Sequence, residues 1–114
     1  MKVIIAGSRD INMSIKKLQE VIDESGFTIT EVVSGGSGMI DKLGEEWGLS
    51  NCVPVSRFTA AWQTYGASAG PRRNKQMAEY ADALIAVWDD QSRGTKNMID
   101  LARQRSLKIF VYHV

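Results

Sequence analysis

The chain has 114 residues, of which 44% are hydrophobic, and 14 Lys and Arg against 13 Asp and Glu give a formal net charge of +1. This length and composition predict one compact domain, residues 1–114, with a real hydrophobic core and no room for a second domain. The near-neutral charge excludes a global basic field for nucleic acid or an anionic membrane, so any anion site must be local.

Two rare residue types narrow the chemistry further. Cys52 is the only cysteine, which excludes an internal disulfide and disfavours a zinc site. His113 is the only histidine, so Ser-His-Asp and Cys-His mechanisms are disfavoured. The apolar run at 1–7 is too short for a signal peptide or a membrane span. We therefore expect a cytoplasmic protein with no bound metal, no cofactor and no membrane contact.

Strand and helix patterns alternate from the N-terminus. Residues 3–6 are consecutively apolar and rich in β-branched side chains, as in a strand that helices bury on both faces. A helix follows, capped by Asn12 or Ser14 and ended by Gly26. Its apolar face consists of Ile15, Leu18, Val21 and Ile22.

The middle of the chain continues the alternation. Residues 29–33 predict a second strand, and an apolar stripe of Ile40, Leu43 and Trp47 predicts the next helix. A short third strand is expected at 53–55. The segment 56–70 is the only long irregular stretch, and a loop of that length in a compact domain usually serves function or an interface. It carries Phe58, Trp62 and Tyr65.

The C-terminal part predicts two more helices and two more strands. Gly70-Pro71 begins a helix, since proline suits the first turn, and Met77, Ala78 and Ala81 supply its buried side. A buried strand at 83–88 ends in a polar turn, 89–95. A helix marked by Met98, Leu101 and Ala102 then precedes a last strand at 108–112. The pattern predicts an α/β domain with a five-stranded parallel sheet and helices on both faces.

The stretch 34–38, Ser-Gly-Gly-Ser-Gly, lies between the second strand and the following helix. Its glycines permit positive φ and a close backbone approach, and the next helix N-terminus favours an anion. The pattern is neither the dinucleotide-binding G-x-G-x-x-G nor a P-loop. From the residues alone, a phosphate cradle and an ordinary strand-to-helix turn remain equally open.

Three other polar turns fall at strand or helix ends: 7–10, 70–74 and 89–95. In an open parallel sheet these turns converge on the rim where ligands bind. Arg72, Arg73 and Arg93 lie at helix starts, where a cation opposes the helix dipole by roughly 0.3–1 kcal/mol, which suggests a counter-anion. The alternative is that they form structural ion pairs with Asp10, Asp89 or Asp90. The aromatic side chains Trp62, Tyr65 and Trp88 are either core or interface residues, or stack on a base.

These motifs resemble the YspA/YpsA-related (DUF2493) branch of the SLOG superfamily over the whole chain. The residues that carry the resemblance are Gly7-Ser8-Arg9-Asp10, Ser34-Gly35-Gly36 with Asp41, Ala69 to Asn74 with Met77, and Ser92-Arg93-Gly94-Thr95. It implies a Rossmann-like fold and a site for nucleotides or nucleotide-derived signals. The glycine turn departs from the usual Ser-Gly-Gly-x-x-Gly-x-Asp, because Gly38 comes one place early and Met39 stands where a glycine is expected.

The departure with the greatest consequence concerns catalysis. The LOG-type phosphoribohydrolases of this superfamily carry Gly-Gly-x-Gly-Thr-x-x-Glu, and here Met98 takes the place of the glutamate. Asp100 is ~200° further round the helix and cannot substitute. Glycosidic cleavage requires a placed carboxylate, so the resemblance favours binding over catalysis.

We therefore expect a module that binds a nucleotide or an ADP-ribose-like molecule, as a sensor or as a sequestering protein, including a phage protein directed against nucleotide immune signals. The rival is an N-glycosidic hydrolase that uses Asp10, Asp41 or Glu45. Among the possible partners, nucleic acid is the least favoured. We also expect the chain to form a homo-oligomer, at least a dimer. The predicted phosphate- and ligand-binding residues are Gly7, Ser8, Arg9, Ser34, Gly35, Gly36, Ser37, Gly38, Asp41, Arg72, Asn74, Arg93, Gly94 and Thr95.

Overall fold

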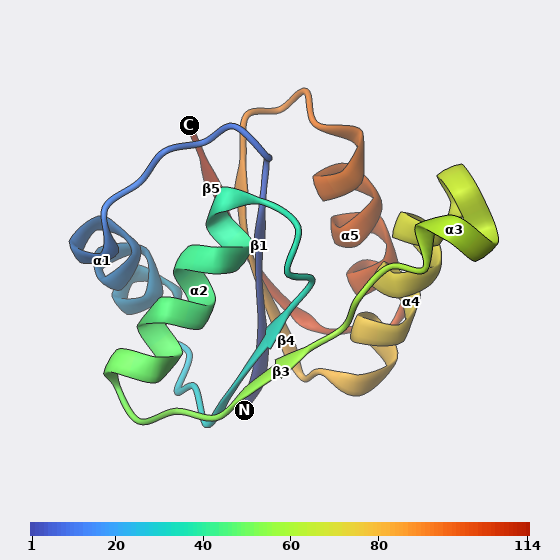
Figure 1. Ribbon diagram of the computed structural model, residues 1–114. Helices are drawn as coiled ribbons and strands as arrows, with labels where there is room; N and C mark the ends of the chain where they lie inside the picture. The colour runs from blue at the N-terminus through green and yellow to red at the C-terminus, as the bar shows by residue number, and fades with distance from the viewer.

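A computed structural model describes residues 1–114 and confirms a Rossmann-like α/β fold with an all-parallel five-stranded sheet (Figure 1). The strands are β1 (Lys2–Gly7), β2 (Glu31–Ser34), β3 (Val55–Arg57), β4 (Ala83–Trp88) and β5 (Lys108–His113). The helices are α1 (Ile15–Ser25), α2 (Met39–Ser50), α3 (Trp62–Tyr65), α4 (Ala69–Tyr80) and α5 (Arg93–Gln104), with a 3₁₀ turn at Gly66–Ser68. None of these helices combines the length and the apolar character needed to cross a membrane.

The strand order in the sheet is β3-β2-β1-β4-β5. The chain builds outward from β1 to β3 and then crosses back to place β4 on the other side of β1. At this reversal Gly7 pairs with Val87, so the carboxyl ends of β1 and β4 lie side by side. In open α/β sheets such a switch point leaves a crevice between the connections that leave in opposite directions, and ligands bind there.

The sheet lies between two layers of helices (Figure 1), and a hydrophobic core packs against each of its faces. Val3 and Ile5 point toward α1 and α2, where Leu18 and Trp47 join them. Ile4 points to the opposite face, which α4 and α5 cover. The alternation follows from the period of two along a strand, and it explains why β1 and β4 are apolar at consecutive positions.

The helix ends follow the capping residues. Of the two candidates for the cap of α1, Ser14 is the cap, since its Oγ accepts a hydrogen bond from the Lys17 amide at 3.0 Å. Gly26 ends α1 in the left-handed conformation, with φ 73°. Ser92 caps α5 by accepting from the Thr95 amide.

Several predicted boundaries differ from the structure. β2 and β3 each begin two residues later than predicted, at Glu31 and Val55. For β3 the reason is local: the Val53 amide donates to the Gly48 carbonyl at the end of α2, and Pro54 has no amide to donate to the sheet. The segment 56–70, predicted to be irregular, contains α3 and the 3₁₀ turn, and α4 begins at Ala69 rather than at Gly70-Pro71.

Candidate functional site

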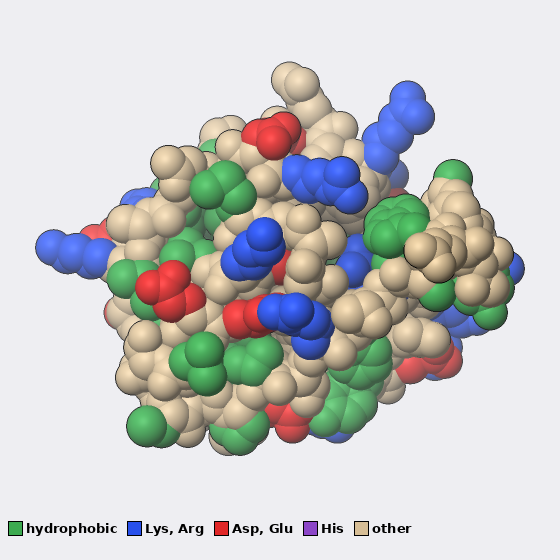
Figure 2. Space-filling model, in the orientation of Figure 1, with side chains coloured by type: hydrophobic (Ala, Val, Ile, Leu, Met, Phe, Trp, Pro, Cys, Tyr) green, Lys and Arg blue, Asp and Glu red, His purple; other side chains and the backbone are tan.

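A polar cleft of about 730 Å³ opens at the carboxyl ends of β1 and β4. Its size falls within the range of roughly 300–1,000 Å³ typical of small-molecule sites. In Figure 2, Lys and Arg side chains gather around a hollow between the start of α2 and α3. The sequence-predicted residues that line the cleft are Gly7, Ser8, Arg9, Ser37, Asp41, Asn74, Arg93, Gly94 and Thr95.

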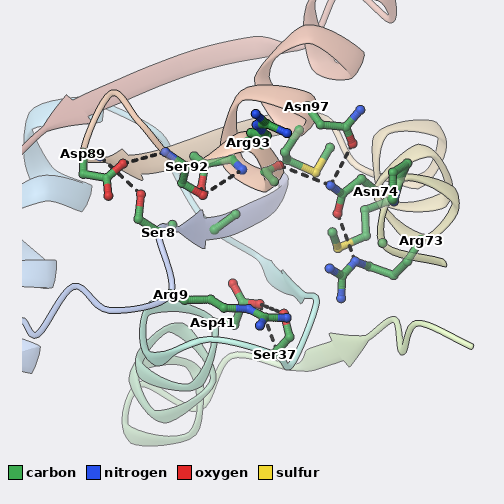
Figure 3. A pocket seen from close by; sticks show the side chains of 18 of the residues that line it. Ser8, Arg9, Ser37, Asp41, Arg73, Asn74, Asp89, Ser92, Arg93 and Asn97 are labelled. Atoms are coloured by element: carbon green, nitrogen blue, oxygen red, sulfur yellow. Dashed lines mark hydrogen bonds between the residues drawn. The ribbon is translucent and has the colours of Figure 1, made fainter. Parts of the chain in front are cut away.

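Five predicted residues, Ser34, Gly35, Gly36, Gly38 and Arg72, do not line this cleft. The first three form the inner part of the glycine turn. Gly38 is the N-cap of α2. Arg72 lies on the outer side of α4. The turns at 7–10, 34–38 and 93–95 nevertheless meet at one end of the sheet, as the sequence predicts for strand carboxyl ends (Figure 3).

Ser34 braces the glycine turn from within. Its Oγ donates to Glu45 Oε2 at 2.7 Å and accepts from the Gly36 amide at 3.0 Å. Arg57 forms an ion pair with Glu45, and this contact holds the pKa of that carboxyl below its usual value. Gly36 has φ 66°, a conformation that a side chain would strain. The glycine-rich motif therefore serves first to shape the turn.

Asp41 occupies the N-terminal end of α2. Its Oδ2 accepts hydrogen bonds from the Ser37 amide at 3.0 Å and from Ser37 Oγ at 3.3 Å (Figure 3). The side chain is 6% exposed. Burial raises the pKa of Asp41, although Ser37 and the nearby Arg73 favour its charged form. A helix N-terminus that already holds a carboxylate offers little to a phosphate.

The raised pKa of Asp41 allows us to predict how the stability of the Asp41→Asn variant depends on pH. Folded Asp41 binds its proton more tightly than the unfolded residue, whose ordinary pKa is 3.8, so its contribution to stability is lost as the pH rises through the folded pKa. The asparagine side chain of the variant does not titrate. As the pH rises from below 3.8 to neutral, the wild type loses the stability that the protonated Asp41 contributes, and the variant does not. We therefore expect the unfolding free energy of the variant minus that of the wild type to increase over this pH range. Urea unfolding across this range measures the difference, and a decrease with rising pH would contradict the prediction.

The start of α5 is open to an anion. Asp89 Oδ1 accepts from the amides of Gln91 and Ser92, at 2.9 and 2.8 Å, and these bonds lower the pKa of Asp89 and fix the preceding loop. The amides of Arg93 and Gly94 have no acceptor within the chain. A Cβ built on Gly94 would meet nothing within 4 Å. Two free amides at a helix N-terminus thus face accessible space.

Three arginines from three different elements line the cleft: Arg9, Arg73 and Arg93. None of them forms an ion pair within the chain. The alternative of structural pairing with Asp10, Asp89 or Asp90 is therefore not realised. Asp10 forms no ion pair, Asp89 binds backbone amides and Asp90 contacts the only histidine. The positive side chains of the cleft are available to a ligand.

Arg73 is the most constrained of these arginines. Its Nη1 donates to the Gly35 carbonyl at 2.7 Å and its Nε to Asn74 Oδ1 at 2.9 Å, while Asn74 Nδ2 donates to Asn97 at 3.0 Å. Arg73 is only 9% exposed. Burial lowers its pKa, Asp41 opposes that effect, and Arg9 adds to it by like-charge repulsion. Arginine nonetheless remains charged in proteins, so the cleft holds a buried cation without a partner ion.

The absence of a side chain at Gly35 leaves room for this arginine. A Cβ on Gly35 would lie 2.7 Å from Arg73 Nη1 and 2.9 Å from its Cζ. Real Cβ atoms essentially never approach so closely. The guanidinium group of Arg73 thus connects α4 to the glycine turn and packs in the space that Gly35 leaves open.

The helical phase of α4 decides which arginine enters the cleft. Arg73 and Met77 are four residues apart and share the buried face, whereas Arg72 is turned about 100° away. The Arg72 guanidinium lies 4.2 Å from the centroid of the Tyr65 ring. Trp62, 47% exposed, lines the cleft beside Gly70. The spacing to Met77 was the sequence signal that separates Arg73 from Arg72.

Met98 forms part of the cleft wall and is 1% exposed, because it also packs in the layer between α4, α5 and the sheet. Asp100 points elsewhere and pairs with Lys96 at 2.9 Å. The carboxylates that line the cleft are Asp10, Asp41 and Asp89. The structure contains no group of three or more His, Cys, Asp or Glu side chains placed to hold a metal ion.

Comparison with known proteins places this geometry in context. Residues 1–65 match the model of a family described as YAcAr: YspA, cpYpsA-related SLOG family. The X-ray structure of DNA processing protein A (DprA) from Streptococcus pneumoniae is similar, with a TM-score of 0.76 and 18% sequence identity, over 96% of this chain and 49% of that chain. The chain thus spans about half the length of that protein, and the likeness shows the fold alone. No curated protein matches the sequence.

Proposed function

Because the chain belongs to the YspA, cpYpsA-related SLOG family, we propose that its cleft binds a nucleotide or a nucleotide-derived ligand such as ADP-ribose. One observation carries the proposal. Arg73 is buried at the cleft wall, feels the positive charge of Arg9, and has no ion pair within the chain. An unpaired positive charge buried in the cleft wall makes the electrostatic potential of the cleft positive, so the cleft favours an anionic ligand even where the anion does not contact Arg73 itself.

The start of α5 is the best place for the phosphate. The free amides of Arg93 and Gly94 and the Arg93 side chain would donate to phosphate oxygens, and Arg9 would add charge. The start of α2 is less suited, because the carboxylate of Asp41 already lies there. The exposed Trp62 ring is the aromatic surface in the cleft on which a base would stack.

Binding without turnover would suit a sensor or a protein that sequesters its ligand. With Met98 at the position of the hydrolase glutamate, nothing in α5 supplies the acid or base for cleavage. Sequestration of a nucleotide immune signal by a phage protein is one form of this function. The ligand's phosphate and base would be recognised in the same way in each case.

Calorimetric titration of ADP-ribose, AMP and adenosine into the wild-type protein tests the proposal. We expect saturable binding of ADP-ribose and AMP. Adenosine, which lacks the phosphate, should bind at least tenfold more weakly, because a charge-assisted hydrogen bond contributes about 1.5–3 kcal/mol. Equal affinity for adenosine and AMP, or no binding of either phosphorylated compound, would rule the proposal out.

A second candidate function is N-glycosidic hydrolysis. The observation in its favour is that Asp41 is a buried carboxyl on the cleft wall with a raised pKa, a property of groups that act as general acids. Against it, the hydrogen bonds from Ser37 tie Asp41 to the helix start. We therefore rank binding first.

We also propose a homo-oligomer, at least a dimer. Trp62 and Tyr65 on α3 are both 47% exposed, and α3 projects from the body of the domain beside α4 (Figure 1). A second copy that covers α3 would bury both rings and help close the mouth of the cleft. Light scattering at micromolar concentration with ADP-ribose present should give at least twice the monomer mass of 12.6 kDa. A monomer under these conditions would contradict this proposal.

A further inference from the structure

Two oppositely charged side chains on the cleft wall are both buried and do not touch each other. Asp41 comes from α2 and is 6% exposed, and Arg73 comes from α4 and is 9% exposed. Figure 3 shows Asp41 at the start of α2 and Arg73 projecting from α4. They influence each other electrostatically, yet no nitrogen of Arg73 lies within 4.0 Å of an Asp41 oxygen. The space between them is too wide for a direct ion pair.

Each side chain has used some of its hydrogen-bonding atoms on the protein and kept one free. Asp41 Oδ2 accepts from Ser37, and the Gly38 amide also lies near this carboxylate, but no side chain donates to Oδ1. Arg73 Nη1 donates to the Gly35 carbonyl and its Nε donates to Asn74, whereas its Nη2 has no acceptor within the chain. Neither free atom is sealed from the cleft, because no fully buried side-chain nitrogen or oxygen lacks a partner.

The free atoms differ in kind, one acceptor and one donor, and this selects what fits between them. A phosphate would satisfy Arg73 but would face the Asp41 carboxylate. A purely basic group would have the opposite conflict. A hydroxyl donates to the carboxylate through its hydrogen and accepts from the guanidinium through its oxygen, so it satisfies both atoms at once.

We propose that Asp41 and Arg73 form a subsite for a ribose hydroxyl of the ligand. The inference rests on the proposed function, because it names the sugar that accompanies the phosphate. With the phosphate at the start of α5, the sugar lies toward α2, and Asp41 Oδ1 accepts the hydrogen bond of the 2′- or 3′-hydroxyl. The site therefore selects ribonucleotides over nucleotides that lack that hydroxyl, since the bound analogue shields these two polar atoms from water without giving them a partner.

Calorimetric titrations of AMP, 2′-deoxyAMP and 3′-deoxyAMP into the wild-type and Asp41→Asn proteins test this subsite. We expect the wild type to bind AMP about 10- to 100-fold more tightly than at least one deoxy analogue. Asparagine keeps an oxygen for the Ser37 amide, so the variant should remain folded, as its melting temperature will show. It should bind AMP more weakly than the wild type and discriminate less than threefold between AMP and that deoxy analogue. A purely structural role for Asp41 would weaken all three ligands alike.

Equal binding of the three ligands by the wild type would overturn the subsite and leave the proposed function standing. Discrimination that survives unchanged in Asp41→Asn would also overturn it. If the wild type binds none of the three, the subsite is wrong, and if ADP-ribose also fails to bind, the proposed function falls with it.

Discussion

Replacing Arg73 with alanine is expected to lower the affinity for ADP-ribose by about 10- to 100-fold, since the variant loses at least one charge-assisted hydrogen bond to the ligand. The same change leaves the Gly35 carbonyl without its donor at 2.7 Å, and the cost of an unpaired buried group is about 1–3 kcal/mol of stability. Calorimetry at a temperature well below the melting point measures the affinity separately from the stability.

Two further variants separate binding from folding in this experiment. Arg72→Ala is the matched control, because it removes the adjacent arginine of the same helix, whose guanidinium lies over Tyr65 and outside the cleft. It should bind ADP-ribose like the wild type. Gly35→Ala disturbs the same contact without removing any ligand-binding atom. The new Cβ would displace Arg73 Nη1, so the affinity for ADP-ribose should fall. If Arg72→Ala loses as much affinity as Arg73→Ala, the assignment of the cleft arginine is wrong.

The protein is expected to release no free base from AMP above the uncatalysed background, even at saturating nucleotide. Met98 stands where the hydrolases have glutamate, and general acid or base help typically contributes ~10²–10⁴ in rate. Chromatography of the reaction mixture over hours follows the base. Binding and turnover should therefore be clearly separated in the wild-type protein.

Release of base at enzymatic rates would reverse the ranking of the two candidate functions. Asp41→Asn and Asp10→Asn then identify the group responsible, since both residues line the cleft. Loss of release in Asp41→Asn, with ADP-ribose still bound, would assign the acid to the buried carboxyl. Asp100→Asn is the control, because Asp100 pairs with Lys96 away from the cleft.

The fold was predictable because its signals are local. Consecutive apolar residues in β1 and β4 and capping residues such as Ser14 and Gly26 act within a few positions of themselves. The start of β2 was not predictable in this way, because a partner across the sheet fixes it: Glu31 pairs with Lys2 of β1, and that pairing sets where β2 begins. The helix α3 has no buried residue, and its sequence carries no periodic pattern to reveal it.

The site was predictable as a set of turns but not in its internal contacts. Strand carboxyl ends bring Ser8, Asp41 and Arg93 into one cleft whatever the details of packing. The choice of Arg73 over Arg72 follows from the four-residue spacing of Arg73 to the buried Met77, whereas the contact of Arg73 with Gly35 joins two elements far apart in the sequence. The glycine motif was interpreted as room for a ligand, whereas at Gly35 the room is taken by an arginine 38 residues away in sequence.

The central claim is that a phosphorylated ligand sits at the start of α5, and amide NMR spectra recorded during a titration with ADP-ribose test it most directly. The account predicts saturable shifts of the Arg93 and Gly94 amides together with that of Arg9, because free amides at a helix N-terminus respond to a bound anion. Amides on the far end of the sheet, such as that of Asp82, should not move. Shifts confined to other surfaces, or none at millimolar ADP-ribose, would contradict the claim.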